Sequence, residues 1–135
     1  MTKRILLTAL ITLTSFAGVA HADLFAAGPV YGGNIGDFKN GGARITCRVF
    51  NAGLTTATIN LTQIWTNTGS LVVPTSNTCT GSLGVAQYCA FTAPVTGNFA
   101  YSCRVNANGF DANLRGVAEI MGASGIILNA LPLQK

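Results

Sequence analysis

The sequence predicts an all-β protein, a two-sheet immunoglobulin-like sandwich of about seven or eight antiparallel strands. Short runs of alternating polar and apolar residues recur along the chain, and turns rich in Gly and Asn separate them. No apolar stripe of helical period follows residue 22. A similar seven-residue motif also occurs twice, as "CRVFNAG" from Cys47 and "CRVNANG" from Cys103. A small closed β-barrel is the alternative architecture.

The predicted strands follow one another closely. "AGPVYGGNIGDF" predicts a short first strand with a bulge, and Asn40-Gly41 predicts a hairpin turn. We expect a loop over 75–82 and a last hairpin turn at 122–125. The remaining strands are predicted over 43–51, 55–66, 69–73, 85–93, 97–106, 113–121 and 125–131.

The first 22 residues are typical of a secretory signal peptide. Lys3 and Arg4 precede an apolar segment over 5–19, and Ala20-His21-Ala22 supplies small residues for cleavage. That apolar segment is shorter than the roughly 20 residues a spanning helix needs. We therefore expect residues 23–135 to form one disulfide-stabilised domain, secreted or periplasmic, with no membrane span after cleavage.

Four cysteines in an exported chain predict two disulfides. Alternate residues of a strand face opposite sides, so Cys47 faces inward with Ile45 and Val49, and Cys103 faces inward with its own apolar neighbours. Each following arginine, Arg48 or Arg104, then faces outward. We predict that Cys47 pairs with Cys103 across the core and, by elimination, that Cys79 pairs with Cys89.

Three features of the segment over 43–105 resemble a bacterial secreted immunoglobulin-like module. They are Cys47, then Trp65, then Tyr101-Ser102-Cys103. The resemblance implies a core tryptophan and a tyrosine whose hydroxyl bonds backbone upstream. Trp65 also shares the alternation of Ile59 and Leu61, which favours the core over a carbohydrate platform. The later position of Trp65 and the extra Cys79–Cys89 pair depart from that plan, and they leave the strand order open.

The composition gives little support for catalysis, metal binding or nucleic-acid binding. After the first 22 residues the chain has no histidine and no CxxC spacing, and its six basic residues are scattered. Asp37 and Asp111 are the only plausible loop pair of carboxylates, and turn capping explains each more simply. We expect no enzyme, no cofactor and no metal, with a small secreted hydrolase or inhibitor as an alternative.

The sequence thus predicts an exported, non-enzymatic domain for binding, adhesion or structural support, as in the modules it resembles. Its partner would be a protein or a glycan, and Tyr31 and Tyr88 are the best candidates for exposed aromatics. A pilin-like subunit of a surface polymer is an alternative. Pilins borrow their last strand from a neighbour, whereas "GIILNALPL" predicts a terminal strand in this chain.

Overall fold

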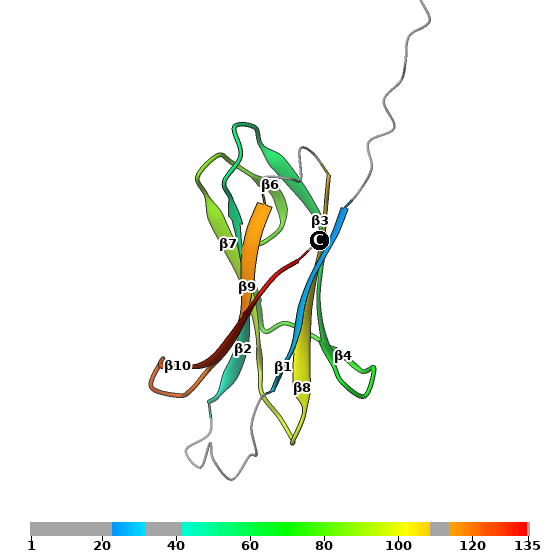
Figure 1. Cartoon of the computed structure of the whole chain (residues 1–135), viewed down its shortest axis with the longest axis vertical. Coiled ribbons are helices and arrows are strands. Elements are labelled where there is room, and N and C mark those ends of the chain that lie inside the picture. Colours follow the sequence, from blue (N-terminus) through cyan, green and yellow to red (C-terminus); the bar gives the residue numbers. More distant parts are fainter. Residues whose placement is uncertain (1–22, 32–41, 109–113, 135) are drawn as a thin grey trace, which may run out of the picture.

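A computed structural model describes residues 23–31, 42–108 and 114–134, which form two packed antiparallel β-sheets (Figure 1). The prediction of an all-β sandwich is confirmed, and the two sheets do not close into a barrel. None of the described residues forms a helix able to span a membrane. The strands are β1 (Asp23–Tyr31), β2 (Arg44–Asn51), β3 (Ala57–Thr66), β4 (Leu71–Val72), β5 (Ser76–Asn77), β6 (Gly81–Leu83), β7 (Tyr88–Pro94), β8 (Ala100–Asn108), β9 (Leu114–Met121) and β10 (Ile127–Pro132).

The first sheet has the order β1-β8-β3-β4, with β6 also pairing with β3. The second sheet has the order β10-β9-β2-β7-β5. The two repeated phrases therefore lie on central strands of different sheets, β2 and β8. Most predicted strands appear within a few residues of their expected bounds. The loop predicted over 75–82 is wrong in part, because β5 and most of β6 lie there. The Asn40-Gly41 turn lies outside the described residues.

The core lies between the sheets and centres on the Cys47–Cys103 disulfide. Both cysteines are fully buried, and their Cα atoms are 6.0 Å apart. Ile45 and Val49 are buried on the same side of β2, as the alternation predicts. Buried residues alternate with partly exposed ones along the whole of β8. The predicted pairing is confirmed, and it joins the central strands of the two sheets.

The Cys79–Cys89 disulfide, also predicted, closes one side of the sandwich. Its Cα atoms are 4.9 Å apart, and both cysteines are buried. The chain passes from β4 in the first sheet to β5 in the second and back to β6 in the first. The disulfide ties this crossing segment to β7, while the Asn77 amide donates to Thr62 Oγ1 at 2.8 Å and links it to β3.

Tyr101 anchors the turn that precedes β8. Its side chain is fully buried, and its hydroxyl donates to the Thr96 carbonyl at 2.7 Å. The same oxygen accepts a hydrogen bond from the Thr96 backbone N–H at 2.9 Å. The prediction that this hydroxyl bonds backbone upstream is confirmed. A buried hydroxyl with both of these bonds carries no desolvation penalty for an unmet group.

A β-bulge in β3 overturns the prediction for Trp65. In the pairing of β3 with β8, the register shifts between Ile59, opposite Ala107, and Leu61, opposite Asn106. A one-residue shift exchanges the two faces of a strand. Beyond the bulge Ile64 is fully buried, while Trp65 is only partly buried and lies opposite Ser102. Trp65 is therefore an outer-face residue, not a core tryptophan.

The segment that follows β10 pairs with β1. Ala26 and Gln134 exchange two backbone hydrogen bonds of 2.9 and 2.8 Å, just after β10 ends. Figure 1 shows β10 crossing toward β1 near the C-terminus. β1 carries the bulge predicted for the first strand, between Ala27 and Val30. The terminal strand β10 pairs with β9 of its own chain, as predicted.

Candidate functional site

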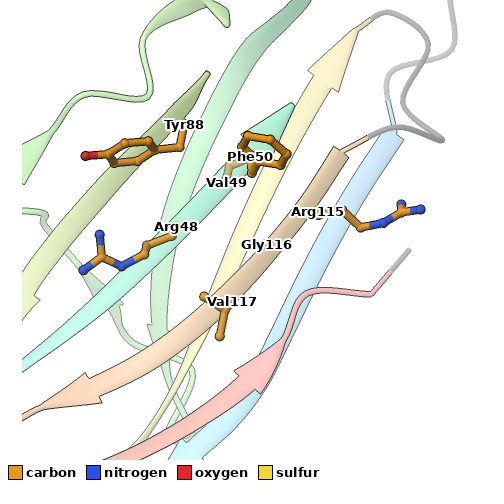
Figure 2. Close-up of a pocket in the computed structure, with 7 residues that line it drawn as sticks. All are labelled: Arg48, Val49, Phe50, Tyr88, Arg115, Gly116 and Val117. Atoms are coloured by element: carbon orange, nitrogen blue, oxygen red, sulfur yellow. The ribbon is translucent and has the colours of Figure 1, made fainter. Parts of the chain in front are cut away.

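The candidate site lies on the outer face of the second sheet, where three strands bring aromatic and basic side chains together (Figure 2). We call it the Phe50 patch, and it consists of Arg48 and Phe50 from β2, Tyr88 from β7, and Arg115 and Val117 from β9. These residues, with Val49 and Gly116, line a shallow pocket of about 450 Å³. That volume falls within the range of roughly 300–1,000 Å³ that ligand-binding pockets occupy.

Strand register puts these side chains together. Phe50 lies directly opposite Tyr88 on one side and Arg115 on the other. Two residues along β2, Arg48 lies opposite Val117. Directly opposite residues share a face, so all five side chains lie on the face away from the Cys47–Cys103 disulfide. Phe50 is 41% exposed and Tyr88 is 70% exposed, so both present apolar surface to solvent.

The electrostatics of the patch depend on one carboxylate. The Arg48 Nε donates to Glu119 Oε2 at 2.9 Å, and the Glu119 side chain is only 10% exposed. The Arg48 side chain is 41% exposed, so its guanidinium spans from the buried carboxylate to the surface. Met121 Sδ accepts weak hydrogen bonds from Arg48 Nη2 and from Thr46 Oγ1. The guanidinium group of Arg48 is thus bonded to Glu119 on one side and accessible to solvent on the other.

Arg115 borders the patch at the start of β9. Its Nη1 donates to the carbonyl of Leu114 at 3.1 Å. In Figure 2 the guanidinium groups of Arg48 and Arg115 extend toward opposite sides of Phe50. The patch therefore has an apolar centre flanked by two guanidinium groups, one of which is paired with Glu119.

Gly116 lets β9 and the C-terminal segment approach β2 closely beneath the patch. A Cβ atom there would lie 2.6 Å from the Arg48 carbonyl oxygen and 2.9 Å from Leu133 Cδ1. The Leu133 N–H also donates to the Gly116 carbonyl at 2.8 Å. A side chain at this position would force the strands apart, so the glycine maintains the floor of the patch.

The residues predicted from the sequence fall in different places. The four cysteines are buried and bonded in the predicted pairs. Tyr31 and Tyr88 are 51% and 70% exposed, as predicted, but Tyr31 lies on the first sheet, where its hydroxyl donates to Asn98 Oδ1. Asp37 and Asp111 lie outside the described residues. Among the described residues no group of three His, Cys, Asp or Glu side chains is placed to hold a metal ion.

Sequence reasoning put Arg48 on an outer face and named Tyr88 as an exposed aromatic, but it missed the patch itself. Arg115 and Val117 were not recognised, because their neighbours are set by the pairing of β2 with β9. The alternation of the 113–121 segment places both side chains on one face. That alternation is the only signal in the sequence that pointed to them.

The chemistry of the patch suits binding. Its side chains supply two aromatic rings, an aliphatic group and two guanidinium groups, which are always protonated and cannot act as bases. A scan against protein-family models, a search of curated proteins and a search of solved structures each found no match to this chain.

Proposed function

We propose that this protein is an exported, non-enzymatic binding module that engages a protein partner through the Phe50 patch. The observation that carries the proposal is an aromatic pair, Phe50 and Tyr88, 41% and 70% exposed on a sheet face between two arginines. Aromatic residues and arginine are enriched at the centres of protein interfaces, where a few such residues supply most of the binding energy.

The composition of the patch favours a protein over a sugar as its partner. It has no amide and no accessible carboxylate, since Glu119 is bonded beneath Arg48. Sugar hydroxyl groups need many hydrogen-bond partners, and this surface is mostly apolar. A partner with an apolar side chain near an acidic group would match the apolar centre of the patch and the exposed part of Arg48.

Export is supported by the disulfides. Two disulfides in a small domain are typical of oxidising compartments, that is, the periplasm or the cell exterior. We also propose that the domain is immunoglobulin-like. The Cys47–Cys103 disulfide and the bonds of the Tyr101 hydroxyl support that resemblance, and the outward position of Trp65 departs from it.

The polymer-subunit alternative receives less support. A pilin-like subunit leaves a groove that a strand from a neighbouring subunit fills. In this chain β10 occupies the position beside β9, and the bridge between Ala26 and Gln134 follows it. A binding module needs no strand from a neighbour, so we retain it as the proposal.

The test is a capture experiment on matched variants. The wild type, Tyr88→Ala and Val73→Ala are immobilised, and proteins bound from the exterior fraction of the producing cell are quantified by mass spectrometry. Val73 is 78% exposed and lies outside the patch, so Val73→Ala, which removes a similarly exposed but smaller apolar side chain, is the control. A protein captured by the wild type and the control but lost with Tyr88→Ala is purified for titration.

Direct titration then decides the outcome. We expect Tyr88→Ala to weaken binding by roughly 30-fold or more, because interface hot spots contribute about 2 kcal/mol or more. Val73→Ala should leave the dissociation constant unchanged. If Tyr88→Ala and Phe50→Ala both bind the partner as tightly as the wild type, the Phe50 patch is not the binding surface.

A further inference from the structure

The outer face of the first sheet carries a second surface of different chemistry. We call it the Trp65 face, and it consists of Asn60, Gln63 and Trp65 from β3 with Arg104 and Asn106 from β8. Gln63 lies directly opposite Arg104, and Trp65 lies opposite Ser102 in the next row. The bulge at Asn60 puts Trp65 on this face, since without the shift its alternation would point it into the core.

Side-chain hydrogen bonds order this surface. Trp65 Nε1 donates to Gln63 Oε1 at 3.2 Å, which places the nitrogen edge of the indole next to that amide. One row beyond Arg104, the Asn60 amide donates to Asn106 Oδ1 at 3.2 Å. Each of these amides keeps further donors or acceptors after its one bond, because a side-chain amide has two N–H groups and two lone pairs. A partly exposed indole thus lies beside the Gln63 amide, and the Asn60 and Asn106 amides lie about two rows away, each with unused hydrogen-bonding groups.

Arg104 gives the Trp65 face its charge. Within the described residues the only ion pair joins Arg48 to Glu119 on the opposite sheet, and no carboxylate lies in ion-pair distance of Arg104. Arg104 is only partly exposed and lies on a central strand, between Ala26 of β1 and Gln63 of β3. A guanidinium in this position favours an anionic ligand that accepts two parallel N–H hydrogen bonds, such as a carboxylate or a sulfate.

We propose that the Trp65 face binds an acidic glycan, with a sugar ring stacked on Trp65 and its carboxylate or sulfate on Arg104. The two rows are about 7 Å apart along the strands, so a ring on Trp65 brings its acidic group to Arg104. Gln63, Asn60 and Asn106 then bond hydroxyl groups of the same chain. This ligand matches the flat aromatic ring, the cation and the amides, which share the face with the exposed Leu24, Leu61 and Leu71.

The chemistry favours a glycan over an acidic peptide here. An extended peptide obtains most of its affinity from a strand edge, whereas Arg104 lies on β8, a central strand that pairs with β1 on one side and with β3 on the other. A ligand on this face meets side chains only. The hydroxyl groups of a sugar chain can bond to scattered amides. The side chains of a peptide instead need pockets, and the pocket of about 450 Å³ lies on the opposite sheet.

The test uses the only tryptophan in the chain as its own probe. The protein is titrated with a galacturonate hexamer, its methyl ester, a heparin hexasaccharide and hexaglutamate. Trp65 fluorescence and calorimetry are recorded together. We expect the galacturonate or the heparin fragment to change the fluorescence and to bind at least 10-fold more tightly than the methyl ester. Because heparin carries carboxylates as well as sulfates, binding of the galacturonate shows that a carboxylate suffices, and binding of the heparin fragment alone shows that a sulfate is required.

Variants assign the site by calorimetry. Trp65→Ala and Arg104→Gln should each weaken binding by roughly 10- to 100-fold, since a charge-assisted bond or a lost stacking surface is worth that much. Tyr88→Ala, on the opposite face, should leave it unchanged, which separates this site from the Phe50 patch. The proposal is overturned if neither acidic glycan binds, if the ester binds equally well, or if binding survives both variants. Hexaglutamate binding that persists in Trp65→Ala would assign the face to acidic peptides instead.

Discussion

Each outer face of the sandwich contains an arginine from the same Cys-Arg-Val motif, and the two faces differ in the neighbours of that arginine. In each, Cys-Arg-Val puts a cysteine in the core and the next residue on the exterior. Arg48 bonds the buried carboxylate of Glu119, whereas Arg104 lies beside Gln63, and no carboxylate of the described residues is in ion-pair distance of it. Around Arg48 the neighbours are aromatic and aliphatic, and around Arg104 they include amides and one indole beside Ala26 and Leu61.

This difference shows that a repeated strand fixes architecture but not function. The shared phrase determines which residues enter the core and which leave it, because strands alternate. The neighbouring strands then decide whether an outward arginine is held by the protein or remains for a ligand. β9 supplies Glu119 to the second sheet, and the described residues supply no equivalent acid to the first.

The largest expected effect concerns the disulfide that both faces share. Replacing Cys47 and Cys103 with alanine should lower the free energy of unfolding by about 4 kcal/mol, because the bridge closes a long loop of the unfolded chain. Replacing Cys79 and Cys89 should cost about 3 kcal/mol, since that loop is shorter. Both values follow from denaturant titration. A smaller loss for the first pair than for the second would contradict the central position of that bridge.

The second prediction separates a core aromatic from an outer-face aromatic. Phe91 is fully buried, and Phe91→Ala should cost about 3–5 kcal/mol. Trp65→Ala removes a larger ring but should cost less than about 1.5 kcal/mol, because Trp65 lies outside the core. Thermal and urea unfolding of the two variants provide the comparison. Equal losses would restore Trp65 to the core and remove the basis of the Trp65 face.

The third prediction compares the two arginines directly. Arg48→Gln leaves the Glu119 carboxylate buried without its ion pair and should cost about 1–3 kcal/mol of stability. Arg104→Gln breaks no ion pair within the described part of the chain and should change stability by less than about 0.5 kcal/mol. The double variant Arg48→Gln/Glu119→Gln serves as the control and should recover part of the loss. Equal effects of the two single variants would mean that the two faces do not differ in this way.

Much of the fold follows from the sequence, because alternation is regular around the cysteines. The inward positions of Cys47 and Cys103 and their pairing follow from this alternation and are confirmed. The backbone bonds of Tyr101 were implied by the resemblance to immunoglobulin-like modules and are also confirmed. Trp65 was placed wrongly because no particular residue type in the sequence marks a β-bulge. The available signal was a change of alternation along this segment. The buried apolar residue is odd-numbered at Ile59 and even-numbered at Ile64.

The binding surfaces were harder to predict than the core. Phe50, Tyr88 and Arg115 come from three segments far apart in the chain, and only the registers of β2 with β7 and β9 align them. Register depends on the packing of both sheets, which one sequence does not reveal. The outward arginines were predicted correctly, but which of them would meet a carboxylate was not.

The most direct test of two different outer faces is collisional quenching of Trp65 fluorescence by acrylamide in the folded protein. The chain has one tryptophan, so the signal comes from a single site. Trp65 on the outer face should be quenched at a substantial fraction of the rate in the unfolded chain, and the galacturonate hexamer should reduce that rate. Emission shifted to the blue and almost unaffected by acrylamide in the folded protein would place Trp65 in the core and contradict the account.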